Sequence, residues 1–206
     1  MPGRDELDSL LDEILDQPGR RDELERQIDE SFVGERAVLV LDMSGFTRTT
    51  QAHGIVEYLL VIRRLRALAT TIVAERGGDI VKTEADNLFA LFPSVAEAVD
   101  AAREIARGVE TANLALARDE RLYLSIGVGF GRVLVIGDED VMGNEVNLAC
   151  KLGEDVAEYG EILLTEAARA ALPDAEAEER AIDVSGLELR HYALRSGRPG
   201  KAGRAS

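Results

Sequence analysis

The stretch that most constrains the fold is residues 36–47, where a short apolar run ends on a carboxylate and a glycine turn. The run Ala37–Leu41 is too short for an ordinary helix, and its two valines favour a strand buried on both faces. Asp42 ends that strand, and Ser44-Gly45-Phe46-Thr47 then begin a helix whose free backbone N–H groups can face a phosphate. The pattern suits a metal-bound phosphate, but on this stretch alone Asp42 or Ser44 can equally be a helix cap.

Composition limits the partners. The net charge of −15 argues against a nucleic-acid partner, because Lys and Arg hold phosphate backbones, and 4% aromatic residues leave little for base stacking. The single cysteine, Cys150, excludes an internal disulfide and a cysteine-based zinc cluster, and reads as a small buried group. The sequence shows neither a signal peptide nor an apolar run of about 18 residues. We therefore expect a cytoplasmic protein that does not insert into membranes.

Two short helices are expected before the first strand. Residues 5–16 place leucines and an isoleucine on one face at helical spacing, and residues 20–32 follow a proline-glycine break with a second, weaker apolar stripe. A helix of about 12 residues is marginal alone, so these helices either pack on the main domain or pair with a second copy. We expect a helical extension over 1–34, a main domain over 35–195 and a disordered tail over 196–206.

The rest of the chain alternates helices with short strands. Helical signals fall at 46–53, 55–75, from Ser94 onward, from about Gly143, and at 166–172. Strand signals fall at 79–84, 87–92, 122–130, 132–136, 160–165 and 187–194. Two hairpins are expected, one with Asp86 at its tip and one that turns at Gly131, so the sheet is at least partly antiparallel.

Three motifs carry the chemistry: D-M-S-G-F-T at 42–47, I-V-K-T-E-A-D at 80–86, and D-V-M-G-N-E-V-N-L-A-C-K at 140–151. Asp42 and Asp86 are isolated carboxylates with the chemistry to bridge two divalent cations against a triphosphate. In their residues, order and separations, the three motifs resemble the class III adenylate/guanylate cyclase catalytic domain over roughly residues 36–194.

The resemblance implies a ferredoxin-like α+β nucleotide cyclase fold, with helices packed on a mostly antiparallel sheet. It also implies a head-to-tail homodimer in which two subunits share each active site. Asp42 and Asp86 would be the metal ligands for two Mg²⁺ or Mn²⁺ ions. The backbone of Ser44, Gly45, Phe46 and Thr47 would cradle the triphosphate.

The remaining matches concern the nucleoside. By resemblance, Lys82 and Asp140 recognise the purine from the other subunit, Asn147 orients the ribose, and Lys151 takes the place of an Arg that stabilises the transition state. A Lys donor and an Asp acceptor suit adenine, so ATP is favoured over GTP. The expected function is an adenylate cyclase, a phosphorus-oxygen lyase that forms 3′,5′-cyclic AMP and pyrophosphate from ATP for signal transduction.

Three departures from the family pattern favour an alternative. Lys151 lacks the planar fork of Arg, Ala85 stands where a glycine is common beside Asp86, and Ser185 stands where many relatives have a triphosphate-binding Lys. The alternative is a weak or inactive cyclase-like module that binds ATP and cations in a regulatory role. In that module Glu84 would either recruit Ca²⁺ or face solvent. Each residue also has a simpler alternative: Lys82 can be a strand-edge charge, Asp140 a turn residue, Asn147 a packed polar group of the helix, and Lys151 a partner of Glu154 or Asp155.

Overall fold

The structure is a computed structural model that describes residues 2–44, 54–116, 121–184 and 187–195. Gly45, Phe46 and Thr47, the helix expected over 46–53, Ser185 and the tail from Ser196 lie outside these ranges. Among the described residues no helix is both long and apolar enough to span a bilayer.

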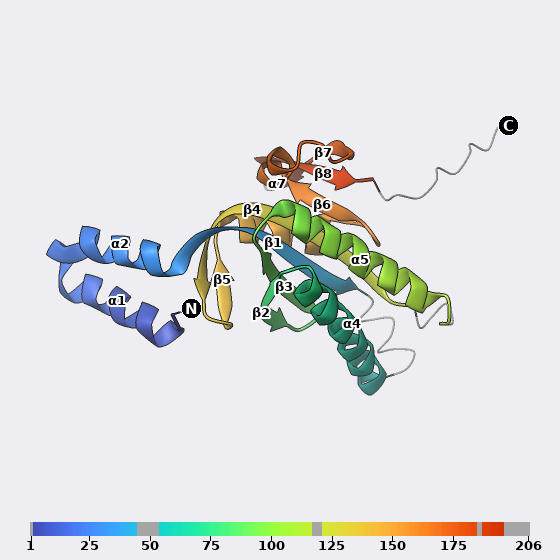
Figure 1. The fold of residues 1–206 in the computed structure, drawn as a ribbon, viewed down its shortest axis with the longest axis horizontal. Helices are drawn as coiled ribbons and strands as arrows, with labels where there is room; N and C mark the ends of the chain where they lie inside the picture. The colour runs from blue at the N-terminus through green and yellow to red at the C-terminus, as the bar shows by residue number, and fades with distance from the viewer. Residues whose placement is uncertain (1, 45–53, 117–120, 185–186, 196–206) are drawn as a thin grey trace.

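One mixed sheet forms the centre of the molecule (Figure 1). Its strands are β1 (Val33–Ser44), β2 (Asp79–Glu84), β3 (Asn87–Phe92), β4 (Tyr123–Ile136), β5 (Asp140–Met142), β6 (Ile162–Thr165), β7 (Ala177–Val184) and β8 (Leu187–Leu194). They lie in the order β2-β3-β1-β4-β6-β8-β7, with β5 paired to β4. β1 is antiparallel to both β3 and β4, whereas β4 and β6 are parallel. The first four strands have the ferredoxin-like order, which confirms the expected α+β fold.

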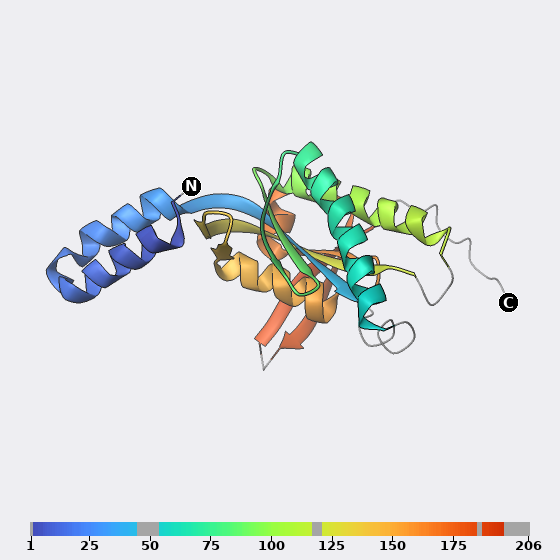
Figure 2. The ribbon, with the colours of Figure 1, turned by 90° about the horizontal axis from the view of Figure 1, so that it is seen from below.

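Helices cover both faces of the sheet (Figure 2). They are α4 (Ile55–Glu75), α5 (Val95–Asn113), α6 (Asn144–Cys150), the π-helix Lys151–Val156 that continues α6, and α7 (Glu166–Ala171). Leu39 and Leu41 of β1 join the core under α4 and α5, and Val38 and Val40 join the core under α6. The whole run Ala37–Leu41 is 0% exposed, which confirms the prediction of a strand buried on both faces.

α5 begins where the sequence predicts. The hydroxyl of Ser94 accepts a hydrogen bond from the Glu97 backbone N–H at 3.3 Å, and the Glu97 carboxylate accepts from the Ser94 backbone N–H at 3.0 Å. This reciprocal pair satisfies two N–H groups that a helix start leaves without intrahelical partners.

The hairpin expected at Gly131 is wrong. β4 runs without a break from Tyr123 to Ile136 and pairs along the whole of β1, and the chain turns only after it, at Gly137. A Cβ on Gly129 would lie 2.6 Å from the backbone oxygen of Glu145, so the glycines of β4 allow α6 to lie directly on the strand. β7 was not predicted from the sequence, because its residues are largely polar.

The two N-terminal helices, α1 (Arg4–Asp16) and α2 (Arg21–Phe32), project from one end of the sheet (Figures 1 and 2). We call residues 2–32 the N-terminal arm. Its apolar side chains pack between the two helices and onto Ile136 at the end of β4. Packing on the main domain therefore occurs, and Leu15 of α1 remains 77% exposed. The division at residue 34 remains a prediction.

Candidate functional site

Two elements bring Asp42 and Asp86 together. Asp42 lies near the end of β1, and Asp86 lies at the tip of the β2–β3 hairpin, whose strand β3 pairs with β1. Burial in the first place, and the charge of Asp86 in the second, raise the pKa of Asp42 to about 6. Glu154 and Asp155 add smaller effects of the same sign. Because Leu41 of β1 pairs with Leu88 of β3, Asp42 and the hairpin tip lie at the same end of these strands, where their like charges repel each other.

α4 supports the tip of this hairpin through two side chains. The Tyr58 hydroxyl donates to Asp86 Oδ2 at 3.1 Å, and Arg66 Nη2 donates to the backbone oxygen of Ala85. Tyr58 is only 6% exposed, and burial together with the charge of Asp86 raises its pKa to about 12. Sequence reasoning missed this role. The signal available was a tyrosine within an apolar helix face, since a buried tyrosine hydroxyl needs a partner.

Ala85, beside Asp86, adopts a left-handed backbone conformation. Among the described residues it is the one non-glycine residue with positive φ, at 49°. An L-residue with a Cβ is disfavoured in this left-handed region, where glycine is not. The strain lies directly beside Asp86, in the backbone that carries this carboxylate.

Lys82 and Asp140 meet on a neighbouring part of the sheet. Lys82 Nζ lies 3.3 Å from Asp140 Oδ1 and 2.8 Å from a carboxylate oxygen of Glu84. Hydrogen bonding to Glu84 first, and to Asp140, raises the pKa of Lys82. The side chain of Glu84 is 65% exposed, in agreement with its solvent-facing alternative. A cationic donor and an anionic acceptor thus stand side by side.

Asn147 and Lys151 lie on and just after α6. Asn147 is exposed on the helix, and Lys151 begins the π-helical segment. Lys151 Nζ donates to Asp155 Oδ2 at 2.7 Å, which is one of the alternative partners considered from the sequence. Cys150 between them is half-buried, and burial raises the pKa of its thiol to about 11, so at neutral pH it is a protonated packing group.

The donor set suits divalent cations. Among the described residues no group of three or more His, Cys, Asp and Glu side chains is placed to hold a metal ion. Asp42 and Asp86 nevertheless form a hard-oxygen pair whose mutual repulsion a cation would relieve. A Mg²⁺ ion needs only one or two protein carboxylates when phosphate oxygens and water supply its other ligands.

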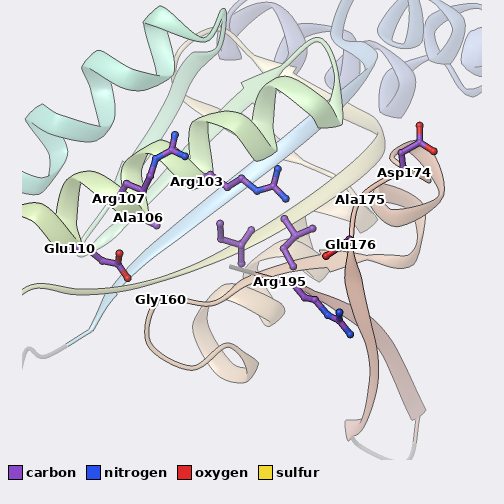
Figure 3. A pocket seen from close by; sticks show the side chains of 11 residues that line it. Arg103, Ala106, Arg107, Glu110, Gly160, Asp174, Ala175, Glu176 and Arg195 are labelled. Atoms are coloured by element: carbon purple, nitrogen blue, oxygen red, sulfur yellow. The ribbon is translucent and has the colours of Figure 1, made fainter. Parts of the chain in front are cut away.

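A cavity of about 640 Å³ opens elsewhere, between α5 and the strands β6 and β8 (Figure 3). Its lining includes Arg103, Arg107 and Arg195 together with Glu110, Asp174 and Glu176. None of the motif residues lines it, so the chemistry predicted from the motifs does not use this space.

Comparisons with known proteins concern the family and the fold. No protein-family model matches the chain. A putative adenylate cyclase 3 of Rhizobium meliloti is 26% identical over 130 residues, which is 63% of this chain and 22% of that protein. An adenylate cyclase of Streptomyces coelicolor is 35% identical over 127 residues, 60% of this chain and 31% of that protein. The chain thus spans a third or less of the length of either protein.

Solved structures agree on the fold. The adenylate/guanylate cyclase/hydrolase from Silicibacter pomeroyi superposes with a TM-score of 0.67 at 24% identity, over 79% of this chain and 96% of that one. The resemblance stated from the motifs is therefore confirmed at the level of fold. The domain has the fold of a class III adenylate/guanylate cyclase catalytic domain.

Proposed function

We propose that this protein is a class III nucleotide cyclase that converts ATP into 3′,5′-cyclic AMP and pyrophosphate. The observation that carries the proposal is the convergence of Asp42 and Asp86, which lie far apart in the sequence but are brought to one end of the sheet by the pairing of β1 with β3 and of β3 with β2. The Lys82–Asp140 pair supports the choice of a purine nucleotide. Named adenylate cyclases among the relatives support the same reaction.

In this proposal each described residue has one task. Lys82 donates to a ring nitrogen of adenine and Asp140 accepts from its amino group, a polarity that guanine would reverse. Asn147 orients the ribose so that its 3′ hydroxyl faces the α-phosphorus, and Lys151 neutralises charge as pyrophosphate leaves. Asp42 and Asp86 would hold two Mg²⁺ or Mn²⁺ ions, which when bound lower the pKa of the attacking hydroxyl and screen the phosphates.

A homodimer is part of the proposal. At the start of α4 the side chains of Ile55, Val56 and Leu59 are 53%, 67% and 56% exposed. Adjacent exposed apolar side chains of this kind suit burial by another subunit. Because a shared site needs two chains, turnover per chain should rise with protein concentration through the range in which dimers form.

The test is product formation. Purified protein is incubated with ATP or GTP and with Mn²⁺ or Mg²⁺, and cyclic AMP and cyclic GMP are both measured. We expect cyclic AMP from the wild type and none from Asp42→Asn or Asp86→Asn. Asp100→Asn, which removes an exposed carboxylate on α5, is the matched control and should keep full activity. Cyclic GMP as the main product would refute the assignment of ATP.

One observation favours a second candidate, a cyclase-like module that binds ATP and cations but turns over weakly or not at all. Lys151, which should neutralise the transition state, is already held by Asp155 at 2.7 Å and lacks the two-point grip of Arg. Tight ATP binding without product, with product gained in Lys151→Arg, would support this candidate. Asp155→Asn tests separately whether release of Lys151 is sufficient.

A further inference from the structure

Pro2 and Arg4 of the N-terminal arm contact the turn between β4 and β5. The backbone oxygen of Pro2 accepts from the Gly137 N–H at 3.0 Å. The guanidinium of Arg4 lies 3.5 Å from Glu139 and 3.3 Å from Asp140 Oδ2. Apolar packing on Ile136 holds the arm at the same end of β4. Three successive polar contacts and one apolar contact thus dock the arm beside Asp140.

The carboxylate of Asp140 is nearly saturated by these contacts. Its Oδ1 lies 3.3 Å from Lys82 Nζ and accepts from the Val141 N–H at 3.0 Å, while its Oδ2 accepts from Arg4 Nη2. An ionised carboxylate offers about four lone-pair directions, so about one remains. The side chain of Asp140 is only 20% exposed, which leaves little room for another donor.

We propose that Arg4 competes with the nucleobase for Asp140, so that the N-terminal arm sets the affinity of the site for an amino-bearing purine. The inference rests on the proposed function, in which Asp140 accepts from the adenine amino group. With the arm docked, Oδ2 of Asp140 accepts a hydrogen bond from the Arg4 guanidinium, and binding of the base is weakened. When the arm lifts away, both lone pairs of Oδ2 become available to the base.

The direction in which nucleotide affinity changes when Arg4 is removed distinguishes competition for Asp140 from long-range electrostatics. The chain carries a net charge of −15, so removal of any cation should weaken the binding of a polyphosphate through long-range repulsion. Removal of Arg4 should instead strengthen it. Arg21 of the same arm pairs with Glu25 at 2.6 Å within α2 and provides the matched control for the loss of one positive charge.

The experiment measures equilibrium binding of α,β-methylene ATP, which cannot release pyrophosphate, to the full chain with Mn²⁺. Arg4→Ala should bind about two- to fivefold more tightly than the wild type, the range expected for a partly exposed ion pair, and Arg21→Ala should not. The inosine analogue, which has a carbonyl in place of the amino group, should bind Arg4→Ala no more tightly than the wild type. In an Asp140→Ala background the Arg4 substitution should no longer tighten binding.

The outcomes separate the two hypotheses. If Asp140→Ala weakens binding but Arg4→Ala does not tighten it, competition by Arg4 is refuted while base recognition by Asp140 stands. If Asp140→Ala leaves the affinity unchanged, or if neither the wild type nor Arg4→Ala binds, both fail. Thermal melting of Arg4→Ala checks that the domain remains folded, and Arg4→Gln must reproduce the gain in affinity.

Discussion

The phenol of Tyr58 on α4 donates a 3.1 Å hydrogen bond to Oδ2 of Asp86 at the tip of the β2–β3 hairpin. A helix on one face of the sheet thereby holds a carboxylate that the sequence predicts as a metal ligand. This hydrogen bond connects α4 directly to the Asp42–Asp86 pair.

Tyr58→Phe should therefore destabilise the protein and loosen the hairpin tip. A hydrogen bond to a charged group contributes about 1.5–3 kcal/mol, so the free energy of unfolding should fall by an amount in that range. Urea denaturation measures it. Tyr192→Phe, at a partly buried tyrosine of β8, is the control and should change stability less. Equal losses in both variants would contradict a specific role for the Tyr58 hydroxyl.

Asp42 should make the metal-free protein less stable as pH rises through mild acidity. Its pKa is raised from 3.8 to about 6, first by burial and then by Asp86. A raised pKa in the folded state stabilises the protein fully below the unfolded value, and this contribution is lost as pH rises through the folded value. Denaturation in EDTA from about pH 4 to above 6 should show this fall, and Asp42→Asn should flatten it. An unchanged slope in Asp42→Asn would refute the shift.

Ala85→Gly should stabilise the hairpin tip. A left-handed backbone costs an L-residue about 1–2 kcal/mol, and the extra flexibility of glycine in the unfolded chain offsets roughly 0.5–1 kcal/mol of that. We expect a net gain of about 0.5–1 kcal/mol by thermal or urea unfolding. Ala67→Gly, at an exposed position inside α4, should instead lose about 1 kcal/mol. If both substitutions destabilise equally, the turn at Ala85 is not strained.

Gly129→Ala should disrupt the packing of α6 on β4. The added Cβ would meet the backbone oxygen of Glu145 at 2.6 Å, and a helix backbone cannot move aside locally. Overpacking of this kind costs about 1–3 kcal/mol. Because α6 carries Asn147 and leads into Lys151, nucleotide turnover should fall as well.

The matched control for that substitution is Gly131→Ala. There the added Cβ would meet side-chain atoms of Glu145, at 3.0 Å from Cγ and 3.9 Å from Cβ, and a side chain yields more readily than a helix backbone. Calorimetric melting should therefore show a clearly smaller loss for Gly131→Ala than for Gly129→Ala. The reverse order would show that α6 does not set the need for glycine on β4.

Local elements and the chemistry-bearing motifs could be predicted from the sequence. The bounds of α4, β2 and β3 agree with the expected ranges, because apolar periodicity and a turn between short strands are local signals. The glycines of β4 led to the wrong prediction of a hairpin at Gly131. A glycine that ends a strand and a glycine that makes room for a helix packed on the strand look alike in sequence. Only the close approach of α6 distinguishes the two.

Side chains and their near neighbours were enough to identify the residue types that carry the chemistry and a buried strand such as Ala37–Leu41. The tertiary structure decided which of them meet. The repulsion between Asp42 and Asp86, the support from Tyr58 and the contact of Arg4 with Asp140 all join segments that are distant along the chain. Strand pairing and helix packing bring such segments together, and no local pattern records those contacts.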